Sequence, residues 1–366
     1  MSEQHAYDLR MGVTELTRGR DRLLAAQCES VQPFEVCGVV VAAMHDVCEF
    51  DACAVMLTDN DTTLPSGGIV EGFDPSMCAP FWDNELLDPD FNKFRDLLRC
   101  VDPVATLVDA VDGDLERSPR YQKFYGSNGV TDELRAVFSS GPSCLAVAVF
   151  TRSDGCFTPE EVHDVRELAP VVTATFRASF GQMAVTVDGA GPAVIILDGD
   201  DEITSMTAGG ARLLDDLRGH ELDAAHVPGL IRAAAMRARW SRAPTTVTTR
   251  MVGRSGQWLR VHVAPLQGDA RSVAITIEPA RPDDMFKIVM ESYGFTARET
   301  DIVLRLARGM AAKEVGRDLA ISVHTVRDHI KVIYDKAGVN SRGELIAQLF
   351  TNHYLERFHE SVVHLG

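Results

Sequence analysis

The sequence predicts a multidomain α+β protein in which two α/β domains precede an all-α domain of four short helices. Three observations support this fold class. The 366 residues are enough for two or three domains of about 100–200 residues each. Apolar runs typical of strands alternate with helical patterns up to about residue 280. Four closely spaced helical patterns with clear capping residues follow after residue 295.

Residues 33–180 are expected to form the first α/β domain. The run "PFEVCGVVVAAMHDVC" predicts an apolar helix, and "DACAVMLTD" and "SCLAVAVFTR" predict strands. Between the strands, "PRYQKFYGSNGVTDELRAVF" is polar and predicts a variable loop region. Thr158, Pro159 and Glu161 supply an N-cap, an N1 proline and an N3 acid for a long closing helix. Residues 1–32 are expected to form a separate N-terminal helical segment.

The second α/β domain is expected to span residues 190–280. It opens with a strand, an acidic turn at Asp198, a second strand and a helix. Three antiparallel strands should end it, with a hairpin turn at Ser255 and Gly256. In the middle strand of the three, the alternation places one set of side chains inward (Leu259, Val261, Val263) and the other outward (Trp258, Arg260, His262).

Residues 295–351 are expected to form the all-α domain, after a linker helix over 281–294 and before a tail over 352–366. Capping boxes begin its first and last helices (Thr296 with Glu299, Ser341 with Glu344), and Ser322 is the expected N-cap of the third helix. A three-residue turn, "AIS", separates the second helix from the third. Four short helices with this turn match a helix-turn-helix plan, in which the third helix enters the major groove of DNA.

The third helix has one apolar and one polar face. Val326, Ile330 and Ile333 are spaced by four and three residues, so they should share the buried face. The opposite face carries charged and polar side chains (His324, Arg327, Asp328, Lys331, Asp335). Such a face fits DNA, but a helix with Arg and Lys four residues apart can also be a simple solvated surface.

The stretch from Phe295 to Phe350 resembles the DNA-binding domain of LuxR-type transcriptional regulators. The residues that carry the resemblance are "FTARETDIVLRLARG", "KEVGRDLAIS", "HTVRDHIKVIYDKAGV" and "SRGELIAQLF". The resemblance implies that Arg327, Asp328 and Lys331 face base edges and nearby phosphates. Asp328 could accept a hydrogen bond from a cytosine amino group, or it could hold Arg327. The expected DNA-binding set is Lys313, Ser322, His324, Thr325, Arg327, Asp328, Lys331 and Arg342.

The two α/β domains also resemble known sensory domains. In residues 33–180, the order of helix, strands, loop region, strand and closing helix resembles a GAF-type domain, as does "GCFTPEEVHDVRELAP". Residues 190–280 resemble a PAS domain in their opening strands and helix and in their three-stranded ending. The Asn usual before the PAS helix is replaced by Thr207, which weakens any inference about a ligand. The resemblances imply signal sensing.

Charge is divided unevenly along the chain. Residues 282–366 carry 11 Lys and Arg against 12 Asp and Glu, a net charge of −1, so −16 of the total −17 belongs to residues 1–281. Within 296–350 there are 9 basic and 7 acidic residues, a net charge of +2. The larger part is therefore not expected to bind nucleic acid. The weak positive charge of the smaller part predicts modest affinity per protomer and a need for a homodimer.

No catalytic or metal motif is present, so neither an enzyme nor a cofactor is expected. The sequence has no P-loop, no G-x-S-x-G and no H-E-x-x-H. All eight cysteines lie between Cys28 and Cys156 without a C-x-x-C pair. In a cytoplasmic chain they are expected to be small buried apolar residues, with a redox or metal-sensing cluster as the alternative.

These features predict a cytoplasmic, sequence-specific regulator of transcription. The expected partners are double-stranded DNA, a second copy of the chain, RNA polymerase, and an unidentified small-molecule or protein signal. No membrane partner is expected, because no apolar run approaches about 18 residues. The alternative is an interaction protein that docks a protein partner through its sensory domains. Residues 33–180 are expected to contain either an apolar ligand pocket between sheet and helices or a filled core.

Overall fold

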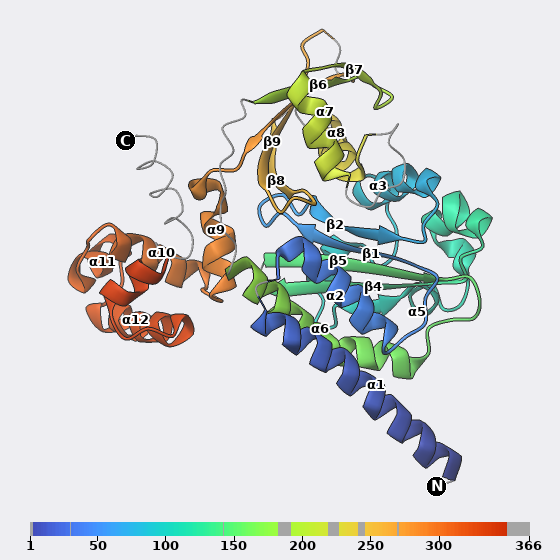
Figure 1. Cartoon of the computed structure of the whole chain (residues 1–366), viewed down its shortest axis with the longest axis horizontal. Helices are drawn as coiled ribbons and strands as arrows, with labels where there is room; N and C mark the ends of the chain where they lie inside the picture. Colours follow the sequence, from blue (N-terminus) through green and yellow to red (C-terminus); the bar gives the residue numbers. More distant parts are fainter. Residues whose placement is uncertain are drawn as a thin grey trace. The chain divides into compact units, whose positions relative to one another are not determined.

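The computed structural model describes residues 3–29, 31–141, 143–181, 192–218, 227–240, 246–268 and 271–349 (Figure 1). These residues form two compact units. The first unit holds the described residues up to 176 and from 192 to 280, and the second holds 177–181 and 281–349. No helix in the described ranges is long and apolar enough to cross a bilayer. The expected tail, residues 352–366, lies outside them.

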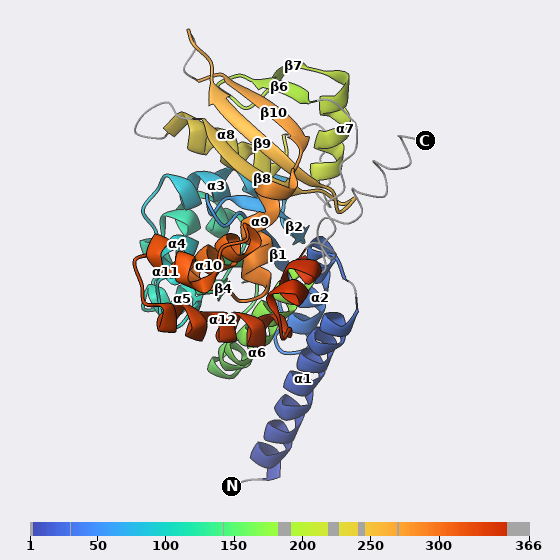
Figure 2. The ribbon, with the colours of Figure 1, turned by 90° about the vertical axis from the view of Figure 1, so that its left-hand side faces the viewer.

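An antiparallel five-stranded sheet in the order β2-β1-β5-β4-β3 organises the beginning of the first unit. Its strands are β1 (Ala52–Thr58), β2 (Pro65–Glu71), β3 (Val104–Thr106), β4 (Asp132–Ser140) and β5 (Ser143–Arg152). The long helices α1 (Glu3–Cys28), α2 (Pro33–His45) and α6 (Pro159–Gly181) lie along one face, and α3 (Cys78–Leu86) lies on the other (Figures 1 and 2). The remaining helices here are short: η1 (Pro75–Met77), α4 (Phe94–Leu97), α5 (Leu107–Ala110), η2 (Leu115–Arg117), η3 (Tyr121–Tyr125) and η4 (Gly126–Asn128).

The helix and strands expected in this domain are confirmed. The apolar runs predicted as a helix and two strands are α2, β1 and β5. The start predicted for α6 is also confirmed, because the Glu161 N–H donates to Thr158 Oγ1 (3.2 Å) and the Thr158 N–H donates to Glu161 Oε2 (2.8 Å). This reciprocal pair satisfies two backbone donors at the helix terminus.

The prediction of a variable loop region between the two strands is wrong for its second half. Residues 132–140 form β4, which pairs with β3 on one side and β5 on the other. The polar sequence of this strand concealed its position, because Asp132, Glu133 and Arg135 are all about 1% exposed. Ion pairs replace water around Glu133 and Arg135, and backbone N–H groups replace it around Asp132.

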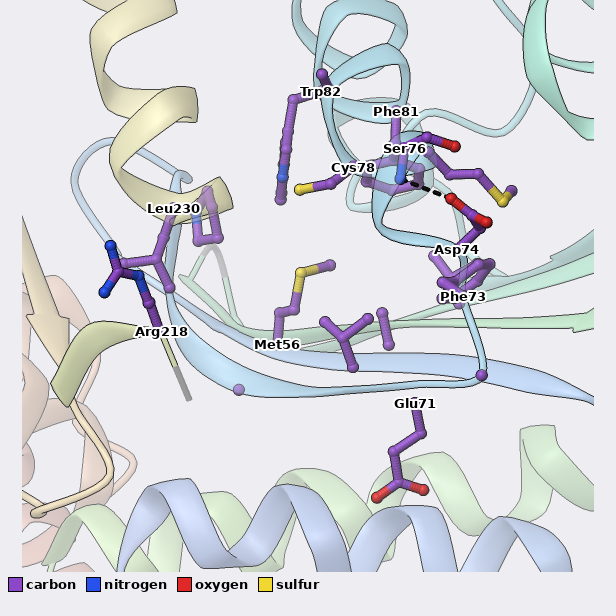
Figure 3. A pocket seen from close by; sticks show the side chains of 18 of the residues that line it. Met56, Glu71, Phe73, Asp74, Ser76, Cys78, Phe81, Trp82, Arg218 and Leu230 are labelled. Atoms are coloured by element: carbon purple, nitrogen blue, oxygen red, sulfur yellow. Dashed lines mark hydrogen bonds between the residues drawn. The ribbon is translucent and has the colours of Figure 1, made fainter. Parts of the chain in front are cut away.

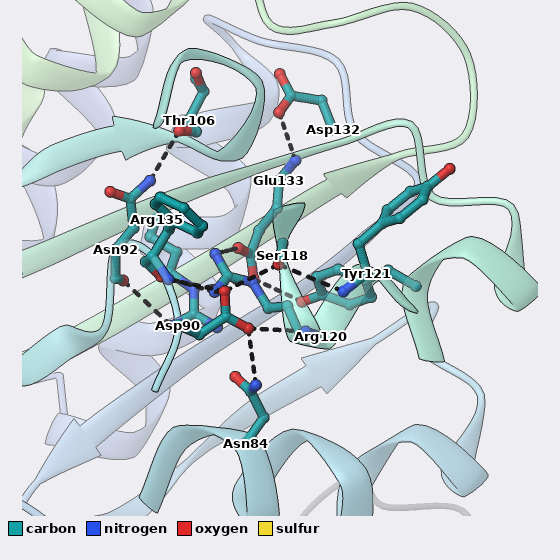
Figure 4. Close-up of polar contacts among 12 residues, drawn as sticks. Asn84, Asp90, Asn92, Thr106, Ser118, Arg120, Tyr121, Asp132, Glu133 and Arg135 are labelled. Carbon is teal, nitrogen blue, oxygen red and sulfur yellow. Dashed lines mark hydrogen bonds and ion pairs between the residues drawn. The ribbon is translucent and has the colours of Figure 1, made fainter. Parts of the chain in front are cut away.

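The buried charges of β4 form one network (Figure 4). Glu133 contacts Arg120 Nη2 at 2.5 Å and accepts from Arg135 Nε at 2.9 Å. Arg135 Nη1 also donates to Glu85 on α3 at 2.7 Å, which ties that helix to the sheet. Burial alone would raise the pKa of Glu133, but the two guanidinium groups outweigh burial and lower it. Glu133 is therefore a carboxylate inside the protein.

A second antiparallel sheet, in the order β7-β6-β10-β9-β8, completes the first unit. Its strands are β6 (Ala193–Leu197), β7 (Ile203–Met206), β8 (Val247–Val252), β9 (Trp258–Pro265) and β10 (Val273–Pro279), and its helices are α7 (Ala208–Leu217) and α8 (Gly229–Trp240). Counted from its own first strand, this sheet repeats the strand order of the first sheet.

The turns expected in the second sheet are confirmed, and one side chain was placed wrongly. Asp198 Oδ1 accepts from the N–H groups of Asp200 and Glu202, which closes the acidic turn. Gly256 has φ +77°, as the hairpin between β8 and β9 requires. Trp258 was expected to face outward, but it is only 3% exposed. The alternation starts one residue later, because the first residue of β9 lies inside the unit.

The two sheets are joined by a buried ion pair and a close backbone approach. Arg250 on β8 donates from its backbone N–H (3.0 Å) and from Nε (2.7 Å) to Asp59 Oδ2 after β1, and Arg250 Nη2 pairs with Asp61. The side chain of Asp59 is fully buried. Gly67 on β2 lies so close to Val252 that an added Cβ would stand 2.6 Å from the Val252 carbonyl oxygen. The core likewise contains residues of both sheets, among them Ala54, Met56, Val149, Ile195, Val261 and Ile275.

The described part of the second unit from residue 281 onward is helical. It contains α9 (Pro282–Ser292), α10 (Ala297–Ala307), α11 (Ala312–Asp318), α12 (Val323–Ala337) and a helical segment over 342–349. The expected linker helix, α9, packs against this domain, because Val289 and Met290 are buried in its core. The other core residues include Phe295, Ile302, Val303, Leu306, Val315, Val326, Ile333 and Leu345.

Candidate functional site

The α12 helix begins as its sequence predicts. Ser322 Oγ accepts from the Thr325 N–H at 3.0 Å, so it caps the first turn. Val326 and Ile333 are fully buried, and Ile330 is half-buried. The predicted apolar face is confirmed, and it fixes which residues of α12 face solvent.

The turn between α11 and α12 depends on a glycine. The Ile321 N–H donates to the Gly316 carbonyl at 2.9 Å. A Cβ at position 316 would stand 2.9 Å from the Ile321 carbonyl oxygen, closer than a side-chain carbon normally approaches. The absence of a side chain at Gly316 therefore lets the turn fold back on α11.

Arg327 and Lys331 lie one turn apart on the exposed face of α12. Within the described part of the chain, neither side chain forms an ion pair or a hydrogen bond. Paired surface cations would need to break an intramolecular contact before binding phosphate. These two cations are free to bind an external anion or base edge.

Asp328 does not hold Arg327, which was one of the two roles considered from the sequence. Its Oδ2 lies 2.9 Å from His324 Nδ1, one turn earlier on the same exposed face. In the chain without DNA, Asp328 therefore pairs with His324 and not with Arg327.

The remaining residues of the expected set lie around this face in different environments. Lys313 is exposed at the start of α11. Ser322 and Thr325 are exposed, and their hydroxyl oxygens lie 2.8 Å apart. Arg342 is half-buried, and its Nη1 donates to the carbonyls of Gly309 and Met310 at 3.3 Å each. Arg342 thus already supports the loop before α11.

One ion pair behind this face, between the partly exposed Lys336 and the buried Glu299, was not expected from the sequence. Lys336 Nζ on α12 donates to Glu299 Oε2 at 2.7 Å and to the Gly294 carbonyl at 2.8 Å. Glu299 is also the capping partner of Thr296, at the start of α10. Burial would raise the pKa of Glu299, but hydrogen bonds from Lys336 and from the Thr296 N–H lower it overall. This cluster joins the end of α12 to the start of α10, and spacing along one helix could not reveal it.

The comparison with known families concerns this domain. Residues 294–349 match the family described as "Bacterial regulatory proteins, luxR family". The C-terminal domain is of the LuxR type. The match covers all four of the helices from α10 to 342–349 and less than a sixth of the chain, so it characterises the LuxR-type domain alone.

Comparisons with whole proteins add little. The Vibrio cholerae VqmA–ligand–DNA complex is 18% identical, with a TM-score of 0.23, over 45% of this chain and 84% of that chain. Escherichia coli SdiA is 12% identical, with a TM-score of 0.32, over 90% and 94%. The R. palustris bacteriophytochrome RpBphP3 is 12% identical, with a TM-score of 0.32, over 73% and 62%. TM-scores this low support no conclusion about fold or ligand. No curated protein matches the sequence.

The first unit contains a large cavity beside its first sheet. Its volume is about 910 Å³, within the range typical of small-molecule sites. A pocket between sheet and helices was one of the two alternatives for residues 33–180, and this alternative is confirmed. The cavity is not confined to residues 33–180, however, because its lining also includes Leu217, Arg218, Val227 and Leu230.

The cysteines differ in their environments. Cys37, Cys48, Cys53 and Cys144 are buried, Cys78 is half-buried, and Cys28, Cys100 and Cys156 are exposed. Burial raises the pKa of the Cys144 thiol to about 11 and that of Cys53 to about 12. These two thiols are protonated at neutral pH and behave as small apolar groups, as expected. The expectation of burial is wrong for Cys28, Cys100 and Cys156, which are exposed.

Proposed function

We propose that this protein is a transcriptional regulator that binds specific double-stranded DNA sequences through α12 of its LuxR-type domain. The observation that carries the proposal is the family match across all four helices, together with Arg327 and Lys331 on the helix that such a domain inserts into the major groove. Both cations are exposed and have no partner among the described residues. Arg327 is assigned to a base edge, and Lys331 to a base edge or an adjacent phosphate.

The supporting DNA contacts are assigned by exposure. Lys313 and Thr325 are exposed beside α12 and are proposed to contact the DNA backbone, as is the hydroxyl of Ser322. Arg342 would have to give up a contact to a loop carbonyl to reach phosphate, so its proposed role is to present that loop. His324 and Asp328 are proposed to act as a pair, with Asp328 free to accept from a cytosine amino group if the DNA displaces His324.

The proposed organisation places sensing before DNA binding. We assign residues 33–180 to a GAF-like domain and residues 190–280 to a PAS-like domain. We assign 281–294 to a connecting helix and 295–351 to the DNA-binding domain. A signal that binds one arrangement of the sensory domains more tightly than the other would shift the protein toward the first arrangement. The resulting change in DNA affinity is limited by the difference between the signal's affinities for the two arrangements. The cavity in the first unit supports sensing over simple structural packing.

A homodimer is the proposed DNA-binding species. Residues 296–350 have a net charge of only +2, and residues 1–281 have −16, so a single protomer has little non-specific attraction to DNA. Two helix-turn-helix domains on one duplex would read half-sites about 10–10.5 base pairs apart, or a multiple of that spacing.

Selection of bound duplexes from a random library tests this proposal. The full chain should enrich a sequence with two related half-sites, and Arg327→Ala should enrich it less and lose the preference at the base pair that Arg327 contacts. A docking protein would enrich no sequence, and this result from a folded wild-type chain would contradict the proposal.

A further inference from the structure

The cavity in the first unit has an apolar floor and an aromatic wall (Figure 3). The floor is the face of the first sheet that carries Ala54, Met56 and Val149, and the wall is α3 with Phe81 and Trp82. Their two rings meet edge to face with centroids 5.2 Å apart. The surfaces favour a ligand with an apolar body that the rings can contact broadly.

The far side of the cavity is closed by the second domain. Leu217 and Arg218 at the end of α7, and Val227 and Leu230 at the start of α8, complete the lining. A molecule that fills the cavity would therefore contact both sensory domains at once. Its binding would depend on their arrangement, which makes the cavity suited to control that arrangement.

Arg218 is the cationic side chain among the described residues that line the cavity. Its Nε is buried and has no hydrogen-bond partner, and within the described residues its side chain forms no ion pair. The two acids near the cavity are not available in the same way. Asp74 accepts from the Ser76 N–H at 2.8 Å, and the carboxylate of Glu71 points to the opposite side of β2 (Figure 3). A buried arginine Nε that has no acceptor among the described residues, beside an apolar cavity, indicates that a ligand supplies the acceptor.

The aromatic wall is held in place before any ligand arrives. Arg135 on β4 pairs with Glu85 on α3, and its guanidinium lies 5.4 Å from the centre of the Phe81 ring. Glu133 in turn holds Arg135. This arrangement fixes α3 against the sheet and reduces the ordering that a ligand must supply.

We propose that this cavity binds a mainly apolar small molecule that carries one carboxylate, and that Arg218 receives the carboxylate. The apolar body lies between the sheet and α3, and the carboxylate lies at the side that α7 and α8 close. Bound ligand links the two sensory domains through Arg218. The effect of the ligand on DNA affinity rests on the function proposed above, whereas binding itself does not.

Two acids and their uncharged counterparts test the proposal on the full chain. Decanoate and 4-phenylbutyrate are compared with decanol and 4-phenylbutanol by isothermal titration calorimetry. At least one acid should bind at least tenfold more tightly than its alcohol, because a charge-assisted hydrogen bond to Arg218 favours the carboxylate. Binding of neither acid, or equal binding of each acid and its alcohol, would overturn the proposal.

Variants locate the site. Arg218→Met should weaken binding of the acid about tenfold and leave the alcohol unaffected, whereas Arg212→Met, an exposed arginine on the same helix, should change neither. Ala54→Leu, which fills the floor of the cavity, should weaken both. Melting curves without probe show whether each variant is folded. A folded Arg218→Met variant with wild-type affinity for the acid would refute the assignment.

The DNA measurement separates this inference from the proposed function. If the acid binds at Arg218 but the chain binds no duplex, the cavity assignment stands and the regulator proposal fails. If the chain binds its duplex and neither acid binds, the cavity assignment fails and the regulator proposal stands. If both bind, saturating acid should change duplex affinity at least threefold in the wild type and not in Arg218→Met.

Discussion

Single residues decide what the exposed face of α12 can recognise. Arg327 offers a planar fork of donors that fits a guanine edge, whereas Lys331 offers a point charge. Asp328 places a carboxylate between them in sequence, and its pairing with His324 keeps it away from Arg327. The face therefore combines one good base reader with limited positive charge, which fits a protein that needs specific rather than general attraction to DNA.

Arg327 should contribute specificity and not only charge. Arg327→Ala should weaken binding to the preferred duplex by about 1–3 kcal/mol, because a bidentate base contact is lost. Arg327→Lys should lose most of the same energy, because lysine keeps the charge but not the fork. Fluorescence anisotropy with preferred and scrambled duplexes measures both. If the Lys variant binds as tightly as wild type, Arg327 contacts phosphate and the assignment to a base is wrong.

Glu133 should make the first unit sensitive to acid. Its pKa is lowered in the folded state because Arg120 and Arg135 outweigh burial. The ionised carboxylate therefore contributes stability above its unfolded pKa of about 4.3, and this contribution is lost as pH falls through the lower folded pKa. Glu133→Gln should cost about 1–3 kcal/mol, because Arg120 and Arg135 lose the carboxylate they share but keep Asp90 and Glu85 as partners.

Denaturant unfolding monitored by fluorescence of the buried tryptophans, at pH 7 and below pH 4, measures this effect. Glu116→Gln, at an exposed position, should leave stability unchanged at both pH values. If Glu133→Gln and the wild type are equally stable at pH 7, the charge of Glu133 makes no net contribution to the free energy of unfolding.

At the scale of elements, the helix starts could be predicted because they depend on neighbouring residues. The strand β4 and one side of the cavity could not be predicted because they depend on residues far apart in the sequence. Thr296, Ser322 and Thr158 cap their helices as predicted, because each cap depends on residues within one turn. The strand β4 was missed because its charges look exposed until Arg120 and Glu85 are placed beside them. The side of the cavity that contains Arg218 was missed for the same reason, since α7 reaches the first sheet only in the folded unit.

Two glycines in the LuxR-type domain should respond oppositely to alanine. Gly316→Ala should destabilise the domain by about 1–3 kcal/mol, because the new Cβ meets the Ile321 carbonyl in the turn, and this exceeds the gain in helix propensity. Gly343→Ala should stabilise it by up to about 1 kcal/mol, because the nearest atom to its Cβ would be 3.9 Å away. Hydrogen exchange of the α11 and α12 amides in the full chain measures both. If the α11 and α12 amides are equally protected from exchange in the Gly316→Ala and Gly343→Ala variants, the close packing of this turn is contradicted.

At the scale of the whole molecule, the first unit combines two sheets that the sequence presents as separate domains. The link between them is concentrated in the buried Asp59–Arg250 pair and in the cavity that both domains line. A signal bound in such a unit can act on both domains without a second site. The acidic charge of this unit leaves DNA binding to the small helical domain.

The pair that Arg250 forms with buried Asp59 should stabilise the joined sheets more than the pair that it forms with exposed Asp61. Arg250→Met should cost about 3–5 kcal/mol, because Asp59 would remain buried without a counter-charge. Asp61→Asn should cost less than about 1 kcal/mol, because Asp61 is 52% exposed. Hydrogen exchange across β1 and β8 reports the loss. If Arg250→Met leaves exchange in both strands unchanged, the pair does not hold the sheets together.

The salt dependence of duplex binding by the full chain tests the central claim most directly. Fluorescence anisotropy on the selected duplex, between about 50 and 200 mM salt, measures the slope of log affinity against log salt concentration. A DNA-binding regulator should show a steep negative slope, and Lys331→Ala should make it shallower if Lys331 contacts phosphate. Failure of the folded wild-type chain to bind the duplex at any of these salt concentrations, or an affinity that does not change with salt, would contradict the account.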